Sequence, residues 1–159
     1  MSATSGSSRS AEASDGGHLG VSNATLLDTL WASMVSLYGD LTTAAGVYGL
    51  TYSQAKALNV LRAGPAPMRA LAGTLRCDAS NMTGIIDRLE ARGLVHREPS
   101  PTDRRVKNVV LSEEGAAAVD SIRAGMHTTH GALDALSTEE RAALQGLLSR
   151  VFLSHDGQA

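Results

Sequence analysis

The chain has 159 residues, 43% of them apolar, which is enough to bury the core of one compact domain or of a small domain with additional helices. The sequence holds no run of 18 apolar residues and no signal-peptide pattern in its first 20 residues, so we expect a cytoplasmic protein without a membrane partner. The net charge of −2 provides no overall basic surface, and the single cysteine, Cys77, excludes an internal disulfide framework and a cysteine-based zinc finger.

The chain opens with residues 1–18, which are rich in Ser, Gly and Ala without periodicity and which we expect to form a disordered tail. Residues 22–46 then alternate apolar spacings of four and three, which is typical of a helix that packs along a seam against a partner. The seam side chains are Leu27, Trp31, Met34, Tyr38, Leu41 and Ala45.

Two short helices are predicted next. Ser53 is the expected cap of the first, which carries Leu58 and Leu61 and stops at Gly64-Pro65. The second helix places four apolar side chains on one face: Met68, Leu71, Ala72 and Leu75.

A fourth helix is predicted between the expected N-cap Asp78 and Gly93. Its apolar side chains recur at helical spacing, at Met82, Ile85, Ile86 and Leu89. The opposite face carries small, polar and charged residues: Ser80, Asn81, Thr83, Gly84, Asp87 and Arg88.

The next two segments, residues 94–97 and 106–111, are β-type runs that flank a connection with Pro and Asp, so they predict a hairpin with the basic tip Arg104-Arg105. Helix, turn, helix and hairpin in this order make a winged helix. Charge supports the assignment, because residues 62–107 hold nine basic and five acidic residues, a local charge of +4 inside an acidic chain.

The C-terminal third is predicted to be helical. Ser112 with Glu113 and Glu114 starts a fifth helix, whose apolar seam continues through Val119, Ile122, Met126, Leu133 and Leu136. A capping box from Ser137 to Glu140 opens a last helix. We therefore expect a mainly α fold with a small β-hairpin wing: a winged helix-turn-helix domain at 49–111 flanked by dimerisation helices at 19–48 and 112–155.

Residues 71–115 read LAGTLRCDASNMTGIIDRLEARGLVHREPSPTDRRVKNVVLSEEG. This segment resembles the signature of the MarR family of bacterial regulators. The likeness lies in the leucine-bearing helix, the Asp-Arg-Leu-Glu core followed by Gly-Leu-Val, the acidic-basic wing tip and the Leu-Ser-x-x-Gly start of the next helix. About 45 consecutive residues match in order and spacing, which is far more specific than a bare helix-turn-helix pattern.

The resemblance implies a two-fold dimer that places its recognition helices in successive major grooves of a pseudo-palindromic DNA operator and its wings in the flanking minor grooves. Small and polar residues at the start of the fourth helix suit approach to base edges. At the wing, the family's Asp-x-Arg arrangement implies that Asp103 orients the tip and that Arg105, then Arg104, enters the minor groove. The expected DNA-binding residues are Ser80, Asn81, Thr83, Gly84, Arg88, Arg104, Arg105 and Lys107.

The favoured function is a ligand-responsive repressor that binds an inverted repeat. Four aromatic residues, Trp31, Tyr38, Tyr48 and Tyr52, are candidates for the pocket of a small aromatic or phenolic effector, although Trp31 and Tyr38 also lie on the predicted seam. An alternative is a constitutive DNA-packaging or protein-interaction module. No Ser/His/Asp arrangement or phosphate-cradling loop in the sequence supports an enzyme, and no cofactor is expected.

Two further groups of residues have a possible chemical role beside an ordinary structural one. Cys77 precedes a helix start, where a lowered thiol pKa would suit a redox regulator, but an inert small side chain is the more common use of such a cysteine. His127, His130 and Asp134 share one helical face, yet two imidazoles and a carboxylate more often form a polar stripe than a metal site.

Overall fold

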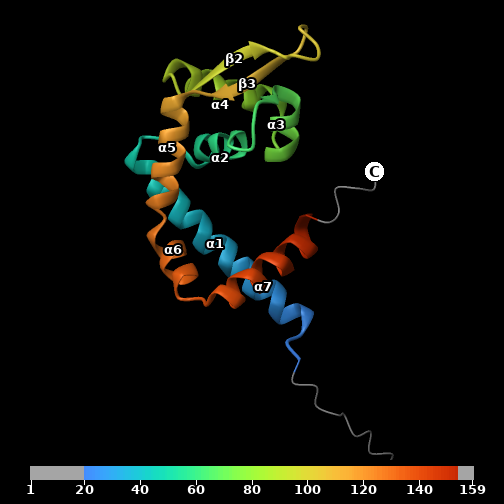
Figure 1. Cartoon of the computed structure of the whole chain (residues 1–159), viewed down its shortest axis with the longest axis vertical. Helices are drawn as coiled ribbons and strands as arrows, with labels where there is room; N and C mark the ends of the chain where they lie inside the picture. Colours follow the sequence, from blue (N-terminus) through green and yellow to red (C-terminus); the bar gives the residue numbers. More distant parts are fainter. Residues whose placement is uncertain (1–19, 154–159) are drawn as a thin grey trace, which may run out of the picture.

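The computed structural model describes residues 20–153, so the tail predicted at 1–18 lies outside the described residues. The fold is mainly helical with a small antiparallel sheet, which confirms the expected winged-helix class (Figure 1). The elements in chain order are α1 (Asn23–Val47), α2 (Tyr52–Leu61), β1 (Ala66–Pro67), α3 (Met68–Leu75), α4 (Ala79–Ala91), β2 (Val95–Pro99), β3 (Lys107–Leu111), α5 (Glu113–Ala124), α6 (His127–Asp134), α7 (Thr138–Leu148) and the π-helical turn η1 (Ser149–Leu153).

Side-chain caps fix where most of these helices begin. Asp78 caps α4, and Ser137 with Glu140 forms a capping box at α7, as the sequence predicted. The prediction for α2 was wrong, because Thr51 and not Ser53 is the cap. Thr51 has an extended backbone and accepts the N–H of Gln54, whose side chain in return accepts the N–H of Thr51, so the reciprocal pair starts the helix two residues earlier.

The wing is an antiparallel hairpin of β2 and β3, with Val95 opposite Leu111 and Pro99 opposite Lys107. The hairpin is confirmed, although both strands begin one residue later than predicted and β2 runs on to Pro99. A third strand was not predicted: β1 pairs with β3 through Ala66 and Val109 and gives the sheet order β1-β3-β2. The sequence could not predict β1, because a strand of only two residues that ends in Pro has no recognisable strand pattern.

The core lies in the helix-sheet module at residues 49–111, called the lobe below, and in the helix ends that touch it. The predicted apolar face of α4 is buried throughout, and every buried hydrophobic side chain of the described residues lies between Ala44 and Ile122. Six large side chains are fully enclosed: Leu58, Leu71, Met82, Ile86, Leu89 and Val109.

Gly115 joins α5 to the lobe at very close range. A Cβ atom at this position would lie 1.9 Å from the backbone oxygen of Leu94, so only glycine lets the first turn of α5 pack against the start of β2. Ser112, the cap of α5, adds a hydrogen bond of 2.6 Å to the backbone oxygen of Gly93. The glycine in the family-like signature thus has a packing reason.

The continuous seam predicted from Val119 to Leu136 was wrong, because α5 ends at Ala124 and α6 starts at His127. Gly125 is a poor helix former and sits at the break. The new helix start has no side-chain cap of its own, and Asp40 of α1 supplies one by accepting the N–H of Thr129 at 2.7 Å. This hydrogen bond lowers the pKa of the Asp40 carboxyl.

Helices α1, α6 and α7 with η1, called the arms below, extend away from the lobe, and α7 crosses the N-terminal half of α1, with which it lines one apolar groove (Figure 1). Neither α6 nor α7 buries a single residue, and α1 buries only Ala44 and Ala45. No helix within residues 20–153 combines the length and apolar character that crossing a membrane requires.

Candidate nucleic-acid interface

The interface candidate is built on α4, whose two faces differ completely. One face is held in the core, and the other exposes Ser80, Asn81, Thr83, Asp87 and Arg88 to solvent. Burial of four apolar side chains on the inner face therefore fixes which side chains point outward. The arrangement leaves a row of hydrogen-bonding groups at the N-terminal end of an exposed helix.

Asp78 orders the first turn of α4. Its carboxylate accepts the Ser80 hydroxyl at 2.6 Å and the Asn81 N–H at 2.7 Å. These two hydrogen bonds, the one from Ser80 being the larger cause, lower the pKa of Asp78. The hydroxyl of Ser80 is therefore engaged in the cap, whereas the exposed side chain of Asn81 keeps its amide free for another contact.

The middle of the outer face is shaped by Thr83, Gly84 and Arg88. The Thr83 hydroxyl donates to the backbone oxygen of Ala79 at 2.8 Å, which holds the side chain in a fixed rotamer. The guanidinium of Arg88 lies over Gly84, 3.6 Å from the position of a Cβ on that residue. Arg88 thus reaches back toward the helix start across a residue without a side chain.

The wing tip is organised by Asp103. Its side chain accepts the N–H of Arg105 at 3.0 Å, and its backbone oxygen accepts the N–H of Val106 at 2.9 Å. Arg104, Arg105 and Lys107 are exposed. These bonds close the turn around the acid and leave the basic side chains projecting from its outer side.

Arg97 connects the wing to α4, a role that the sequence did not predict. From β2, its guanidinium donates to Asp87 at 2.6 Å and to Glu90, and the hydrogen bond to Asp87 is the largest cause of its raised pKa. Asp87, on the outer face of α4, is thus paired with an arginine of the same chain. The bridge fixes the angle between the hairpin and the helix.

Arg92 has a second structural role that the sequence did not predict. At the C-terminal end of α4, it donates to the backbone oxygens of Tyr48 and Gly49 at 2.7 and 2.8 Å and so ties α4 to the α1–α2 connection. Gly49, with φ of +61°, makes this turn. A count of basic residues in the sequence cannot distinguish an arginine that is bonded within the protein from one that is free to bind a partner.

Of the nine basic residues at 62–107, three are committed to partners inside the protein: Arg62 to Asp120, Arg92 to the backbone and Arg97 to α4. The other six have no ion pair within residues 20–153: Arg69, Arg76, Arg88, Arg104, Arg105 and Lys107. All six are exposed, and they lie on α3, the turn after it, α4 and the wing. The available positive charge therefore lies on the helix-turn-helix elements and on the wing.

The four aromatic residues named as effector candidates do not line one cavity. Tyr38 and Tyr52 lie in contact, with ring centroids 4.4 Å apart, and join α1 to α2. Trp31 and Tyr38 share an open apolar groove on α1, and Tyr48 offers its backbone to Arg92. A different cavity of about 190 Å³ lies where α1, α2 and α5 meet, lined by Leu37, Leu41, Ala55, Asn59, Val119, Ile122, Arg123 and Met126.

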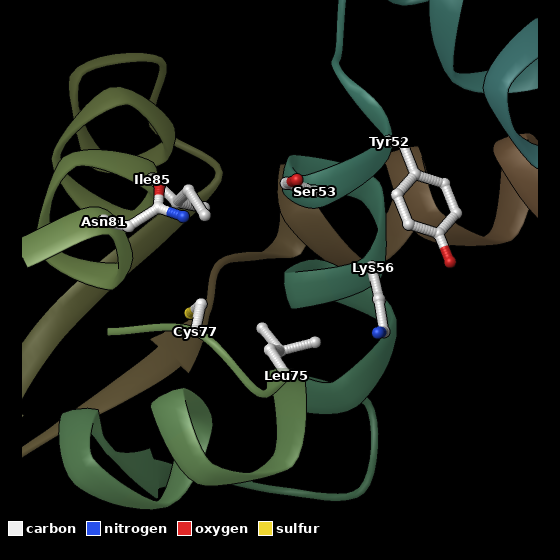
Figure 2. Close-up of a pocket in the computed structure, with 7 residues that line it drawn as sticks. All are labelled: Tyr52, Ser53, Lys56, Leu75, Cys77, Asn81 and Ile85. Carbon is white, nitrogen blue, oxygen red and sulfur yellow. The ribbon is translucent and has the colours of Figure 1, made fainter. Parts of the chain in front are cut away.

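Cys77 lines a small pocket between α2, the end of α3 and α4 (Figure 2). The cysteine is half-buried, and its neighbours around the pocket are Tyr52, Ser53, Lys56, Leu75, Asn81 and Ile85. The volume of about 100 Å³ falls below the roughly 300 Å³ at which ligand pockets begin. The space suits a few water molecules better than an aromatic effector.

His127, His130 and Asp134 lie on α6, and His130 contacts the backbone oxygen of Arg123 at 2.8 Å. Among residues 20–153, no three His, Cys, Asp or Glu side chains are grouped to hold a metal ion. The histidine contact instead ties α6 back to the end of α5.

Comparison with known proteins gives a consistent result. The model of the MarR family matches residues 50–107, which is the lobe. The HTH-type transcriptional repressor NicR of Pseudomonas putida is 35% identical over 94 residues, or 58% of this chain and 60% of that protein. A putative transcriptional regulatory protein for the hcr operon of Thauera aromatica is 33% identical over 70% of this chain and 67% of its own length.

Among solved structures, CouR from Rhodococcus jostii, bound to p-coumaroyl-CoA, superposes with a TM-score of 0.62 at 28% identity. The match covers 81% of this chain and 91% of CouR, so it includes the arms as well as the lobe. The family model thus matches within the lobe, whereas the likeness in fold covers most of the chain.

Proposed function

The chain belongs to the MarR family of transcriptional regulators, and from this premise we propose that it binds an inverted-repeat DNA operator as a homodimer and represses transcription until a small ligand releases it. The observation that carries the proposal is the polar outer face of α4, together with six available cations on α3, the turn after it, α4 and the wing. Phosphates require such a basic surface, and base edges require exposed hydrogen-bonding side chains.

In the proposed complex the N-terminal half of α4 enters the major groove. Asn81 pairs with adenine, and Thr83 offers its methyl group to thymine because its hydroxyl is engaged with the backbone. Ser80 and Gly84 let the helix approach closely, and Arg88 reaches a guanine or a phosphate. Discrimination between sequences thus rests on side chains that the core holds in fixed positions.

The wing would bind the flanking minor groove. Arg105 is the proposed inserting residue and Arg104 its neighbour, because Asp103 orders the backbone between them. Lys107, at the start of β3, would contact a phosphate. The Arg97 bridge to α4 would set the distance between major-groove and minor-groove contacts.

Dimerisation is proposed through the arms, in agreement with the division into a DNA-binding lobe at 49–111 and terminal dimerisation helices. Leu27, Trp31 and Phe152 are 66, 70 and 56% exposed in the single chain. An apolar groove between α1 and α7 is lined by Leu26, Leu27, Leu30, Leu144, Leu147, Leu148, Val151 and Phe152. Apolar surface of this extent is typical of an obligate interface.

The effector is proposed to be a small aromatic or phenolic compound in the cavity between α1, α2 and α5. Most of the lining is apolar, and the two polar residues of the wall, Arg123 and Asn59, are joined by a hydrogen bond of 3.0 Å. An apolar cavity of about 150 Å³ accepts benzene, so about 190 Å³ admits one aromatic ring. The cavity joins arm to lobe, and a ligand there shifts the lobe spacing only if its affinity differs between two spacings.

The test of DNA recognition is selection of bound sites from random duplexes. Wild type should select an inverted repeat with half-site centres about 10 bp apart or a multiple of that, and Asn81→Ala and Thr83→Ala should relax single positions in each half-site. Thr42→Ala is the matched control for Thr83→Ala, because Thr42 makes the same backbone hydrogen bond on α1, far from the lobe's outer face.

Selection of no inverted repeat, or identical preferences in wild type and both lobe variants, would favour the packaging-factor alternative. A separate titration of the DNA complex with phenols and aromatic acids tests the effector. Release of DNA together with a raised Tm of the free protein is expected for a ligand that fits. A protein that stays bound to DNA with every such compound would be a regulator without this class of effector.

A further inference from the structure

Arg76 has a backbone conformation that an arginine rarely adopts. Its φ and ψ are 50° and 49°, in the left-handed region, and it is the one non-glycine residue with positive φ in the described part of the chain. The Cβ of an L-residue crowds the following carbonyl oxygen in this region, so glycine or asparagine normally takes it. An arginine here carries a cost that its role should explain.

The end of α3 does not need the arginine side chain. The N–H of Arg76 bonds to the oxygen of Gly73 at 3.2 Å, and the N–H of Cys77 bonds to the oxygen of Ala72 at 3.1 Å. These two bonds make a Schellman cap, which any residue with an N–H completes and glycine completes best. The exposed guanidinium forms no ion pair and no side-chain hydrogen bond with residues 20–153.

The position of Arg76 suggests what the side chain is for. It stands in the turn between α3 and α4, two residues before the N-cap Asp78. In a helix-turn-helix the first helix crosses the DNA backbone and the second enters the major groove, so this turn passes close to phosphates. The carboxylate of Asp78 is engaged with Ser80 and Asn81, and the cation of Arg76 therefore remains available.

We propose that Arg76 is a phosphate-binding residue of the DNA interface, held in a left-handed turn so that its guanidinium meets the strand that flanks the groove entered by α4. The inference rests on the proposed DNA binding. An arginine that clamps a phosphate positions α4 without reading sequence. The chain thus gives up the favourable glycine cap for an additional DNA contact.

The test compares Arg76→Gly with Arg76→Lys in duplexes of several sequences and over a range of salt. Arg76→Gly should melt at the wild-type Tm or above it, because it relieves the left-handed residue. Its affinity should fall about tenfold for every duplex, with a salt slope smaller by about one unit per protomer. Arg76→Lys should keep the wild-type slope. Arg141→Ala, which removes an exposed cation from α7, is the control for net charge.

The results separate this inference from the function on which it rests. If wild type binds and Arg76→Gly binds with the same affinity and slope, the inference is wrong. It is also wrong if Arg76→Gly melts well below wild type, or if its affinity falls for one sequence alone, since these results indicate a structural residue or a base contact. Failure of wild type to bind any selected duplex would instead contradict the proposed function.

Discussion

The lobe and the arms differ in how far a single chain completes them. The lobe encloses six large side chains fully and ties its elements together with Arg92 and Arg97. The arms bury almost nothing: α6 and α7 have no buried residue, and the apolar side chains of α1 and α7 face an open groove. The lobe and the helix ends that pack on it thus enclose a core within one chain, whereas the arms leave apolar side chains exposed that the proposed second copy would cover.

The largest expected effect comes from placing a charge on the arms. Leu147→Glu should be nearly silent in an isolated chain, where Leu147 is 51% exposed, but should bury an unpaired carboxylate in a dimer. A cost of about 3–5 kcal/mol is expected for each such charge. Light scattering should then report a monomeric mass at micromolar concentration, against a dimeric wild type.

The control for this variant is Gln145→Glu, which adds the same charge to the same helix outside the apolar groove. It should remain dimeric. If wild type is itself monomeric at micromolar concentration, the arms do not form a dimer, and the proposed operator with two half-sites is wrong as well. A dimeric Leu147→Glu would place the interface elsewhere on the chain.

The lobe should respond to a different change, one that adds a single methyl group. Gly115→Ala forces a Cβ against the backbone oxygen of Leu94, so α5 must shift, and overpacking of this kind costs about 1–3 kcal/mol. Gly73→Ala on α3 meets nothing within 4 Å and should be neutral or slightly stabilising. Denaturant melts of both variants measure the contrast. Equal stabilities would show that the lobe tolerates movement of α5.

The sequence could predict features that depend on neighbouring residues but not those that depend on residues far apart in the chain. Periodicity and local caps located α1, α4 and α7, because the buried face of a helix and its cap are set by residues three or four apart. Asp78 and the Ser137–Glu140 box are such signals. The helix break at Gly125 was not predicted, because the apolar spacing continues across it. The residue that caps the new helix start, Asp40, lies 89 residues from Thr129.

The candidate site was predictable to a similar degree. The outer face of α4 and the basic wing tip follow from the local pattern and the family-like signature. The internal roles of Arg92 and Arg97 do not, because each depends on groups brought close only by the fold: the backbone of Gly49 is 43 residues away, and Asp87 lies on another element. The left-handed backbone of Arg76 could not be predicted either, because arginine is not a residue type that favours positive φ.

A smaller effect, confined to DNA binding, is expected at the wing. Arg105→Ala should weaken operator binding by about 1–3 kcal/mol and lower the salt slope by roughly one unit. The side chain is exposed, so the unfolding free energy should change by less than about 0.5 kcal/mol. Fluorescence anisotropy across a salt titration measures both quantities. Unchanged affinity and slope would exclude Arg105 from the minor groove.

The smallest effect concerns pH and compares one carboxylate in each region. Asp78 caps α4 in the lobe, and Asp40 caps α6 in the arms; hydrogen bonds lower the pKa of both carboxyls below the ordinary aspartate value of 3.8. A carboxyl with a lowered pKa in the folded state stabilises the protein above its unfolded pKa. That contribution disappears as the pH falls through the folded pKa, when the native carboxylate takes up its proton.

Asparagine at either position keeps a hydrogen-bond acceptor but cannot titrate. Asp78→Asn and Asp40→Asn should therefore each flatten the fall of Tm as the pH is lowered below about 4. The Asp78 variant should change the melting of the lobe, and the Asp40 variant should change amide exchange in α6 while leaving α4 protected. If both variants alter the same amides, the two regions unfold as one cooperative unit, and the independence of the lobe fails.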